Sequence, residues 1–78
     1  MARITELQRT TFERRYVHDP VDSSLYDFYD VNGQRFLQIN TYGRKGRKNP
    51  EKPSQVVQID EAAARRVKAA IEEAFPTL

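Results

Sequence analysis

The stretch LYDFYDVNGQRFLQINTY, residues 25–42, carries the strongest local signal in the chain. Asn32-Gly33 lies between two segments of strand-like pattern, and an Asn-Gly pair in that position favours a two-residue hairpin turn of type I′. This turn would place Tyr29 opposite Phe36 on the neighbouring strand. The sequence therefore predicts two antiparallel strands joined at Asn32-Gly33.

Because strand side chains alternate between the two sides of a sheet, this register sorts the hairpin into two faces. One face is apolar, with an Asp30/Arg35 pair near the turn, and we expect it to be the core face: Tyr26, Phe28, Leu37 and Ile39. The other face mixes rings and amides: Asp27, Tyr29, Val31, Phe36, Gln38, Asn40 and Tyr42. Such a mixture suits a ligand with flat π-faces and hydrogen-bonding edges. Alternatively, Tyr29 and Phe36 form a cross-strand pair that stabilises the sheet, or the N-terminal segment covers them.

A basic loop, residues 43–53, follows the second strand. It contains five cations, Arg44, Lys45, Arg47, Lys48 and Lys52, against one anion, Glu51, a net charge of +4. The whole chain has a net charge of +2, so the remaining residues sum to −2. This concentration indicates either a footprint for an anion or a solvated, disordered loop. Together with the neighbouring rings and amides, it predicts binding of single-stranded nucleic acid, either DNA or RNA.

The C-terminal part of the chain predicts a short strand and a helix. SQVVQID, residues 54–60, has a strand pattern, and Asp60 is then the expected N-cap of a helix that ends before Pro76. Apolar residues recur at helical spacing and form one stripe for packing on the sheet: Ala64, Val67, Ile71, Ala74 and Phe75.

The N-terminal third is ambiguous. Residues 4–17 fit either an amphipathic helix or a strand, and the β-branched and aromatic residues favour a strand from about residue 5 to residue 17. The predicted fold class is therefore α+β, with a four-stranded antiparallel sheet followed by one C-terminal helix. Because one helix cannot cover such a sheet, the second face is either wet or covered by a partner.

The 78 residues correspond to one domain, residues 1–78, of a size at which oligomerisation often supports the core, so we expect a homodimer. The chain has no cysteine for disulfides or thiolate metal sites and a single histidine, His18. MARITELQR, residues 1–9, lacks the apolar core of a signal peptide, and no apolar run reaches membrane-spanning length. We therefore expect a soluble cytoplasmic protein that binds no membrane, metal or cofactor.

Catalysis is not expected. No pair of carboxylates converges on a two-metal or acid–base geometry, and His18 lies in a turn without an identifiable nucleophile. The GRKGRK segment, residues 43–48, lacks the spacing of a phosphate-binding loop, so no small-molecule substrate is expected. The nucleic-acid site is predicted to comprise Tyr29, Phe36, Gln38, Asn40, Tyr42, Arg44, Lys45, Arg47, Lys48 and Lys52. The alternative function is a protein-interaction module whose rings and basic loop dock on an acidic partner protein.

Residues 26–75 resemble the positive cofactor four family of transcriptional coactivators, within the whirly-like single-stranded-DNA-binding fold. The resemblance rests on the Asn32-Gly33 turn, Leu37-x-Ile39, Tyr42, the basic connection, the strand before Asp60 and the terminal helix. It implies a dimer that holds single-stranded nucleic acid with little sequence preference. In that family's pattern, Tyr42 takes the place of the stacking aromatic and the basic loop that of the basic ribbon. The family usually has Arg at the position of Asn40.

Overall fold

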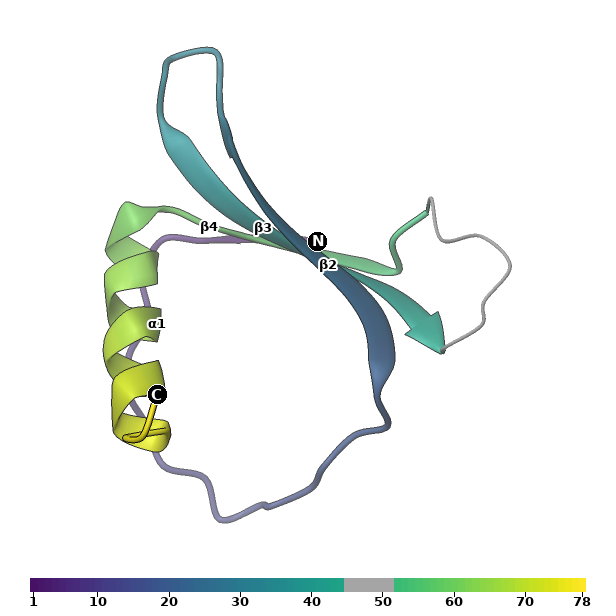
Figure 1. Cartoon of the computed structure of the whole chain (residues 1–78), viewed down its shortest axis with the longest axis vertical. Coiled ribbons are helices and arrows are strands. Elements are labelled where there is room, and N and C mark those ends of the chain that lie inside the picture. The colour runs from purple at the N-terminus through teal and green to yellow at the C-terminus, as the bar shows by residue number, and fades with distance from the viewer. Residues whose placement is uncertain (45–51) are drawn as a thin grey trace.

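The computed structural model of the chain describes residues 1–44 and 52–78, with the backbone but not the side chain of Arg44. Within these residues it has four strands and one helix: β1 (Ala2–Ile4), β2 (Val21–Tyr29), β3 (Arg35–Arg44), β4 (Gln55–Ile59) and α1 (Glu61–Ala74) (Figure 1). The strands form one sheet in the order β1-β4-β3-β2. The predicted α+β class, with a four-stranded sheet and a C-terminal helix, is confirmed.

The sheet is mixed, so the prediction of an entirely antiparallel sheet is wrong. β3 pairs antiparallel with both β2 and β4, but β1 pairs parallel with β4, with Ile4 opposite Ile59. Parallel strands cannot be joined by a tight turn and require a long connection. Here β2 and β3 lie between β1 and β4 in the chain, which provides that connection.

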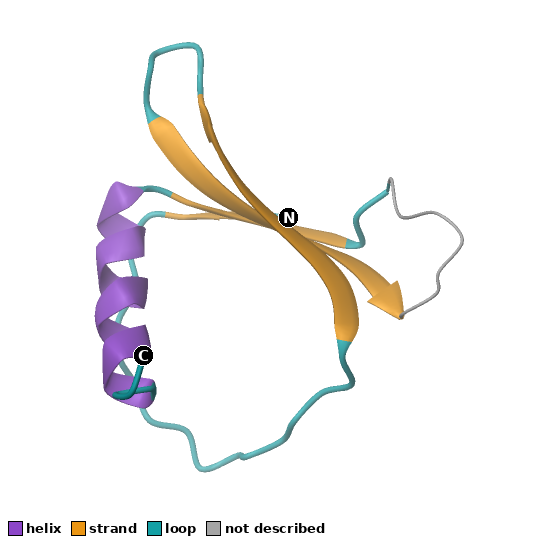
Figure 2. Ribbon diagram, in the orientation of Figure 1, coloured by secondary structure: helices purple, strands orange, loops and turns teal. Residues whose placement is uncertain are grey.

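The N-terminal segment, residues 5–20, is neither the predicted strand nor the alternative helix (Figure 2). It follows α1, where Leu7 is half-buried and Arg9 forms a 3.5 Å ion pair with Glu73, and then runs to the start of β2 (Figure 1). Strand propensity mainly reflects packing against neighbouring strands. Residues 5–20 have no such neighbour among the described residues, which explains why the prediction fails.

The hairpin between β2 and β3 has a three-residue loop, and the predicted two-residue type I′ turn is wrong. The Gly33 N–H donates to the Asp30 carbonyl at 3.0 Å, and the Asp30 N–H donates to the Gln34 carbonyl at 2.9 Å. Among the described residues, only glycines have positive φ, and Gly33 has a φ of 80°. This geometry is a type I turn followed by a glycine bulge, a common hairpin connection.

The Asp30 side chain explains why this loop forms. Its carboxylate oxygen Oδ1 accepts hydrogen bonds from the backbone N–H groups of Asn32 and Gln34, both at 2.9 Å. An aspartate that bonds the backbone two residues on stabilises this kind of turn and competes with the type I′ preference of Asn-Gly. The loop therefore includes Val31 as well as Asn32 and Gly33.

The extra loop residue shifts the register by one residue and re-sorts the faces. Phe28 lies opposite Phe36, and Leu25 lies opposite Ile39. We call one side the aromatic face, defined by Tyr26, Phe28, Phe36 and Tyr42, and the other the aliphatic face, defined by Leu25, Leu37, Ile39, Val57 and Ile59. The predicted core face, which grouped Tyr26 and Phe28 with Leu37 and Ile39, is therefore wrong.

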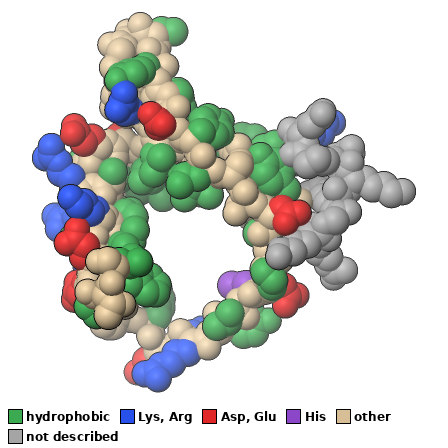
Figure 3. All heavy atoms as spheres, in the orientation of Figure 1, with side chains coloured by type: hydrophobic (Ala, Val, Ile, Leu, Met, Phe, Trp, Pro, Cys, Tyr) green, Lys and Arg blue, Asp and Glu red, His purple; other side chains and the backbone are tan. Residues whose placement is uncertain are grey.

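Helix α1 begins as predicted and packs on the aliphatic face. Asp60 is its N-cap and accepts a 2.9 Å hydrogen bond from the Ala63 N–H, and the helix ends at Ala74, with Phe75 as its C-cap, before Pro76. Ala63 is completely buried, but exposure increases along the helix until 60% of Phe75 is exposed. In the space-filling view an opening remains between α1, the sheet and residues 5–20 (Figure 3). The sheet therefore covers the start of the predicted stripe and leaves its end exposed.

Substitution of Gly33 tests the loop geometry. Gly33→Ala should destabilise the protein by about 1 kcal/mol, because an L-residue is disfavoured at a φ of 80°. A Cβ at this position would meet no atom within 4 Å, so the backbone alone causes the loss. Gly33→Asn should lose less, because Asn tolerates the left-handed region. Urea unfolding measures both, and an alanine variant as stable as the wild type would contradict the turn assignment.

The N-cap gives a pH prediction. Hydrogen bonds from the Ala63 N–H and from the Thr5 side chain lower the pKa of Asp60 below its ordinary value of 3.8. The charged cap therefore contributes stability that is fully present above pH 3.8 and is lost as the pH falls through the lowered folded-state pKa. Asp60→Asn keeps a capping oxygen without the charge. The wild type should be the more stable of the two in urea at pH 6 and lose this advantage in acid; a pH-independent difference would contradict the assignment.

Candidate nucleic-acid interface

The aromatic face presents four rings from β2 and β3. Phe28 and Phe36 stack across the strands with ring centroids 5.7 Å apart and planes at 26°, and the Tyr26 ring lies 6.2 Å from Phe28 on the same strand. Phe36 is only 6% exposed, whereas Tyr26 is 44% exposed and Phe28 is half-buried. Phe36 therefore supports the row from below, and Tyr26 offers the most accessible ring surface.

A continuous chain of hydrogen bonds crosses the same face. Gln58 on β4 donates from Nε2 to Gln38 Oε1 at 2.8 Å, and Gln38 donates from Nε2 to Asn40 Oδ1 at 2.8 Å. Asn40 Nδ2 then reaches Ser24 Oγ at 3.4 Å and the Tyr42 hydroxyl at 3.5 Å, and those two hydroxyls lie 2.9 Å apart. The network joins three strands and holds Tyr42 to the sheet.

This network changes the expected role of the amides. Gln38 and Asn40 are buried and hydrogen-bonded to each other, so their amides order the face. Gln58 is half-buried and lies at the accessible end of the chain of bonds. Buried polar networks of this kind are rigid when every group is satisfied, and no buried side-chain polar atom of the described residues lacks a partner. The result is a pre-ordered surface for the rings.

Charge distinguishes the two faces of the sheet. At the paired positions that the structure describes, the aromatic face includes Arg3, opposite Gln58, and no carboxylate, whereas the aliphatic face includes Asp27 and its ion-pair partner Arg35. Arg3, Gln58, Gln38 and Tyr26 lie in one row across all four strands. A face with rings, amides and a cation is compatible with a polyanion that carries bases.

The end of β3 directs the chain from this face into the basic loop. The β2–β3 register shifts between Val21 and Ser23, and Gly43 on the opposing strand has a φ of 79°. A left-handed glycine at such a shift is typical of a bulge that bends a strand and turns its end. Tyr42, half-buried next to this bulge, is the ring on the face nearest to the loop.

The predicted site residues divide into three groups. Phe36, Gln38, Asn40 and Tyr42 lie together on one side of β3, as expected. Tyr29 lies on the opposite side, because the register shift places it opposite Arg35, whose guanidinium is 4.4 Å from the Tyr29 ring centroid. Lys52 is exposed. The side chain of Arg44, together with Lys45, Arg47 and Lys48, lies outside the described residues.

Some residues of this face are missing from the sequence prediction: Arg3, Ser24, Tyr26, Phe28 and Gln58. The signal that could have found the β2 members is the aspartate two residues before Asn32-Gly33, since Asp30 favours a type I turn with a glycine bulge. With that loop, Tyr26 and Phe28 share a face with Phe36. Arg3 depends on the parallel β1–β4 pair, for which the sequence has no local signal.

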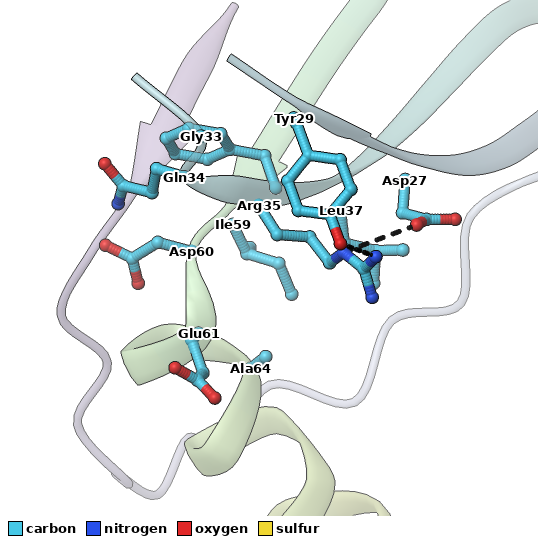
Figure 4. Close-up of a pocket in the computed structure, with 11 residues that line it drawn as sticks. Asp27, Tyr29, Gly33, Gln34, Arg35, Leu37, Ile59, Asp60, Glu61 and Ala64 are labelled. Atoms are coloured by element: carbon cyan, nitrogen blue, oxygen red, sulfur yellow. Dashed lines mark hydrogen bonds and ion pairs between the residues drawn. The ribbon is translucent and has the colours of Figure 1, made fainter. Parts of the chain in front are cut away.

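A concavity of about 690 Å³ lies between the hairpin and the start of α1 (Figure 4). Leu37, Ile59 and Ala64 contribute apolar lining, and Arg35 projects into it beside Tyr29. Arg35 donates a hydrogen bond to the Tyr29 hydroxyl and lies 3.8 Å from an Asp27 carboxylate oxygen. Because Asp27 already neutralises this arginine, the cleft suits an apolar group better than an anion.

The described residues 1–44 and 52–78 contain no group of three or more His, Asp or Glu side chains that could hold a metal ion. In the same part of the chain, no helix is long and apolar enough to cross a membrane. Comparison of the chain with protein-family models, curated proteins and solved structures gave no match. The functional argument therefore rests on the residues of the chain itself.

The network should matter for stability as well as for the site. Gln38→Leu removes the donor to Asn40 Oδ1 and the acceptor for Gln58 Nε2, and should destabilise the protein by about 1–3 kcal/mol. Gln55→Leu is the matched control, because Gln55 is exposed on the neighbouring strand and should change stability by less than about 0.5 kcal/mol. Urea unfolding compares the two, and equal effects would contradict a structural role for the network.

Proposed function

We propose that this protein is a non-catalytic, single-stranded nucleic-acid-binding protein that uses the aromatic face and the basic loop. The observation that carries the proposal is the row of Tyr26, Phe28 and Phe36 on a face that also bears Arg3 and, at its described paired positions, no carboxylate. Tyr42 lies on the same face where β3 enters the loop. Sequence-independent binding follows, because every base has a π-face.

The rings and the cations of this surface contribute to the binding free energy in different ways. Each base stacked on an aromatic side chain contributes about 1–3 kcal/mol, largely independent of sequence and salt. Each phosphate contacted by a cation makes log K fall by about 0.7 per unit of log salt for single strands. Arg3 on β1 and the cations of the basic loop, including Lys52, supply this salt-dependent electrostatic contribution. Stacking on Tyr26 and Tyr42 is therefore needed for binding at physiological salt.

A homodimer is part of this proposal. The aliphatic face and α1 leave large apolar side chains accessible to solvent, including Leu25 at 63%, Ile39 at 40% and Ile71 at 42%. Exposed apolar side chains grouped on one side of a small domain are typical of an interaction surface. Two copies joined on that side would leave both aromatic faces open to one strand and add avidity.

The resemblance of residues 26–75 to the positive cofactor four family points to the same class of ligand. The proposed role is in transcription, replication or repair in the cytoplasm, processes in which single strands are exposed. The alternative is a protein-interaction module that docks on an acidic partner protein through the same rings and loop. Both functions would use the loop cations, so the experiment that distinguishes them asks whether the rings bind nucleic-acid bases.

Fluorescence anisotropy with a labelled single-stranded oligonucleotide of mixed sequence, at low and moderate salt, tests the proposal. Tyr26→Ala should weaken binding about 5- to 100-fold, the loss expected for one stacked base. The charge reversal of Arg44 and Lys45 to Glu should weaken binding most at low salt. No binding by the wild type at low salt would overturn the nucleic-acid proposal in favour of the protein-interaction alternative.

Val31→Ala is the control for Tyr26→Ala, because Val31 is completely exposed and lies in the hairpin loop, outside the strands that form the aromatic face. It should leave oligonucleotide binding unchanged, and circular dichroism checks that each variant is folded. Equal losses for the two variants would show that the aromatic face is not the binding surface. Arg3→Ala should reduce the salt slope by about 0.7, as expected for one phosphate contact.

A further inference from the structure

The outer edge of β2 has no strand partner among the described residues. β2 pairs with β3 and is the last strand in the order β1-β4-β3-β2, and nearly all of its nine residues are exposed. The Asp30 N–H points to β3, where it donates to the Gln34 carbonyl. Because backbone groups alternate along a strand, the N–H and C=O groups of Leu25, Asp27 and Tyr29 point outward. Such an edge is a template for another strand.

The same chain contains an extended segment that has strand composition but no strand partner among residues 1–44 and 52–78. Residues 11–18, TFERRYVH, include Phe12, Tyr16 and Val17, which are 80%, 78% and 89% exposed. Among the described residues, the backbone of this segment forms no hydrogen bond with other backbone groups. A connection of this length without secondary structure is uncommon in a compact domain and often has a function.

We infer that residues 11–18 of one copy of this chain pair as an antiparallel strand with the free edge of β2 in a second copy. The inference rests on the homodimer part of the proposed function and specifies how the second copy joins. It describes β-strand addition, in which main-chain hydrogen bonds supply affinity and alternate side chains supply specificity.

Charge and apolar surface select the register. β2 contains Asp22 and Asp27 and no cation, whereas residues 11–18 contain Arg14 and Arg15 against one glutamate. With Arg14 opposite Asp27, an oppositely charged cross-strand pair forms. The same register places Tyr16 opposite Leu25 and Phe12 opposite Tyr29, on the aliphatic face, where Leu25 is 63% and Tyr29 61% exposed.

The opposite side of the added strand extends the candidate nucleic-acid interface. In this register Arg15 lies opposite Tyr26, on the aromatic face, because side chains alternate. The second copy therefore contributes a cation beside Tyr26, the most accessible ring of the interface, and its Glu13 lies one pair further along, opposite the half-buried Phe28. A phosphate next to a base stacked on Tyr26 would lie within reach of that arginine, so the site is complete only in the dimer.

The placement of residues 5–20 favours a second copy over the chain's own β2. Arg9 is held at Glu73, near the end of α1, while residues 10–20 form an arc from there to the start of β2 (Figure 1). Pairing within one chain would require Phe12 to leave the helix side and move to the hairpin end beside Tyr29. For a second copy, the segment is already extended and accessible.

Proline substitutions test the pairing with a matched control. In the proposed register the Arg14 N–H points to β2 and the Arg15 N–H points away from it. Arg14→Pro should therefore convert the dimer to a monomer in size-exclusion chromatography with light scattering, whereas Arg15→Pro should leave it dimeric. Neither N–H has a backbone partner in the part of the chain that the structure describes, so neither variant should unfold it. A monomeric wild type, or equal effects of the two prolines, would overturn the inference.

Because the chain has no cysteine, cross-linking can identify the partner strand. Two differently tagged chains, Tyr16→Cys and Leu25→Cys, are mixed and treated with a short bis-maleimide. A cross-linked dimer that carries both tags supports the inference. A monomeric product from the double variant, without the mixed dimer, would show pairing within one chain and overturn it. These experiments contain no nucleic acid, so a negative result in them is distinct from a failure of oligonucleotide binding. A wild type that is monomeric but binds the oligonucleotide would refute only the homodimer part of the proposed function.

Discussion

The carboxylate of Asp30 is the group on which the arrangement of the sheet depends. By accepting hydrogen bonds from the N–H groups of Asn32 and Gln34, it stabilises a three-residue loop with Gly33 in the left-handed region. Side chains alternate along a strand, so the loop length decides which residues of β2 share a face with those of β3. With this loop, rings meet rings and aliphatic residues meet aliphatic residues.

The separation of the two faces follows from that register and gives each face a different physical role. On the aromatic face, hydrogen bonds link Gln58 on β4 to Gln38 on β3, and Gln38 to Asn40, so these amide groups are satisfied within the sheet. A ligand that stacks on the neighbouring rings then meets an ordered surface, so less entropy is lost on binding. On the aliphatic face, Arg35 contacts Tyr29 and Asp27 near the hairpin loop. The rest of that face packs through apolar contacts, which α1 provides only near its start.

The sequence predicts the elements that have local signals and fails where distant contacts decide. β4, the Asp60 cap and the end of α1 before Pro76 follow from residue types within a few positions. Tyr42 and Phe36 were correctly placed together because both lie on β3, where alternation alone relates them. The predicted face of Tyr29 is wrong because it depends on the length of the loop, and the predicted strand at residues 5–17 is wrong because a strand forms only beside a partner.

The absence of a strand at residues 5–17 leaves part of the N-terminal segment available for other contacts. Within residues 1–44 and 52–78, residues 11–18 have strand-forming side chains but no strand neighbour, while β2 has an unpaired outer edge and exposed Leu25. Natural proteins usually protect a long edge strand by charge, covering or pairing. The aspartates of β2 provide charge protection against copies of β2 itself, since like charges repel, but they attract the arginines of residues 11–18. In the proposed dimer, these charges would therefore disfavour pairing between two β2 strands and favour pairing of β2 with residues 11–18 of a second copy.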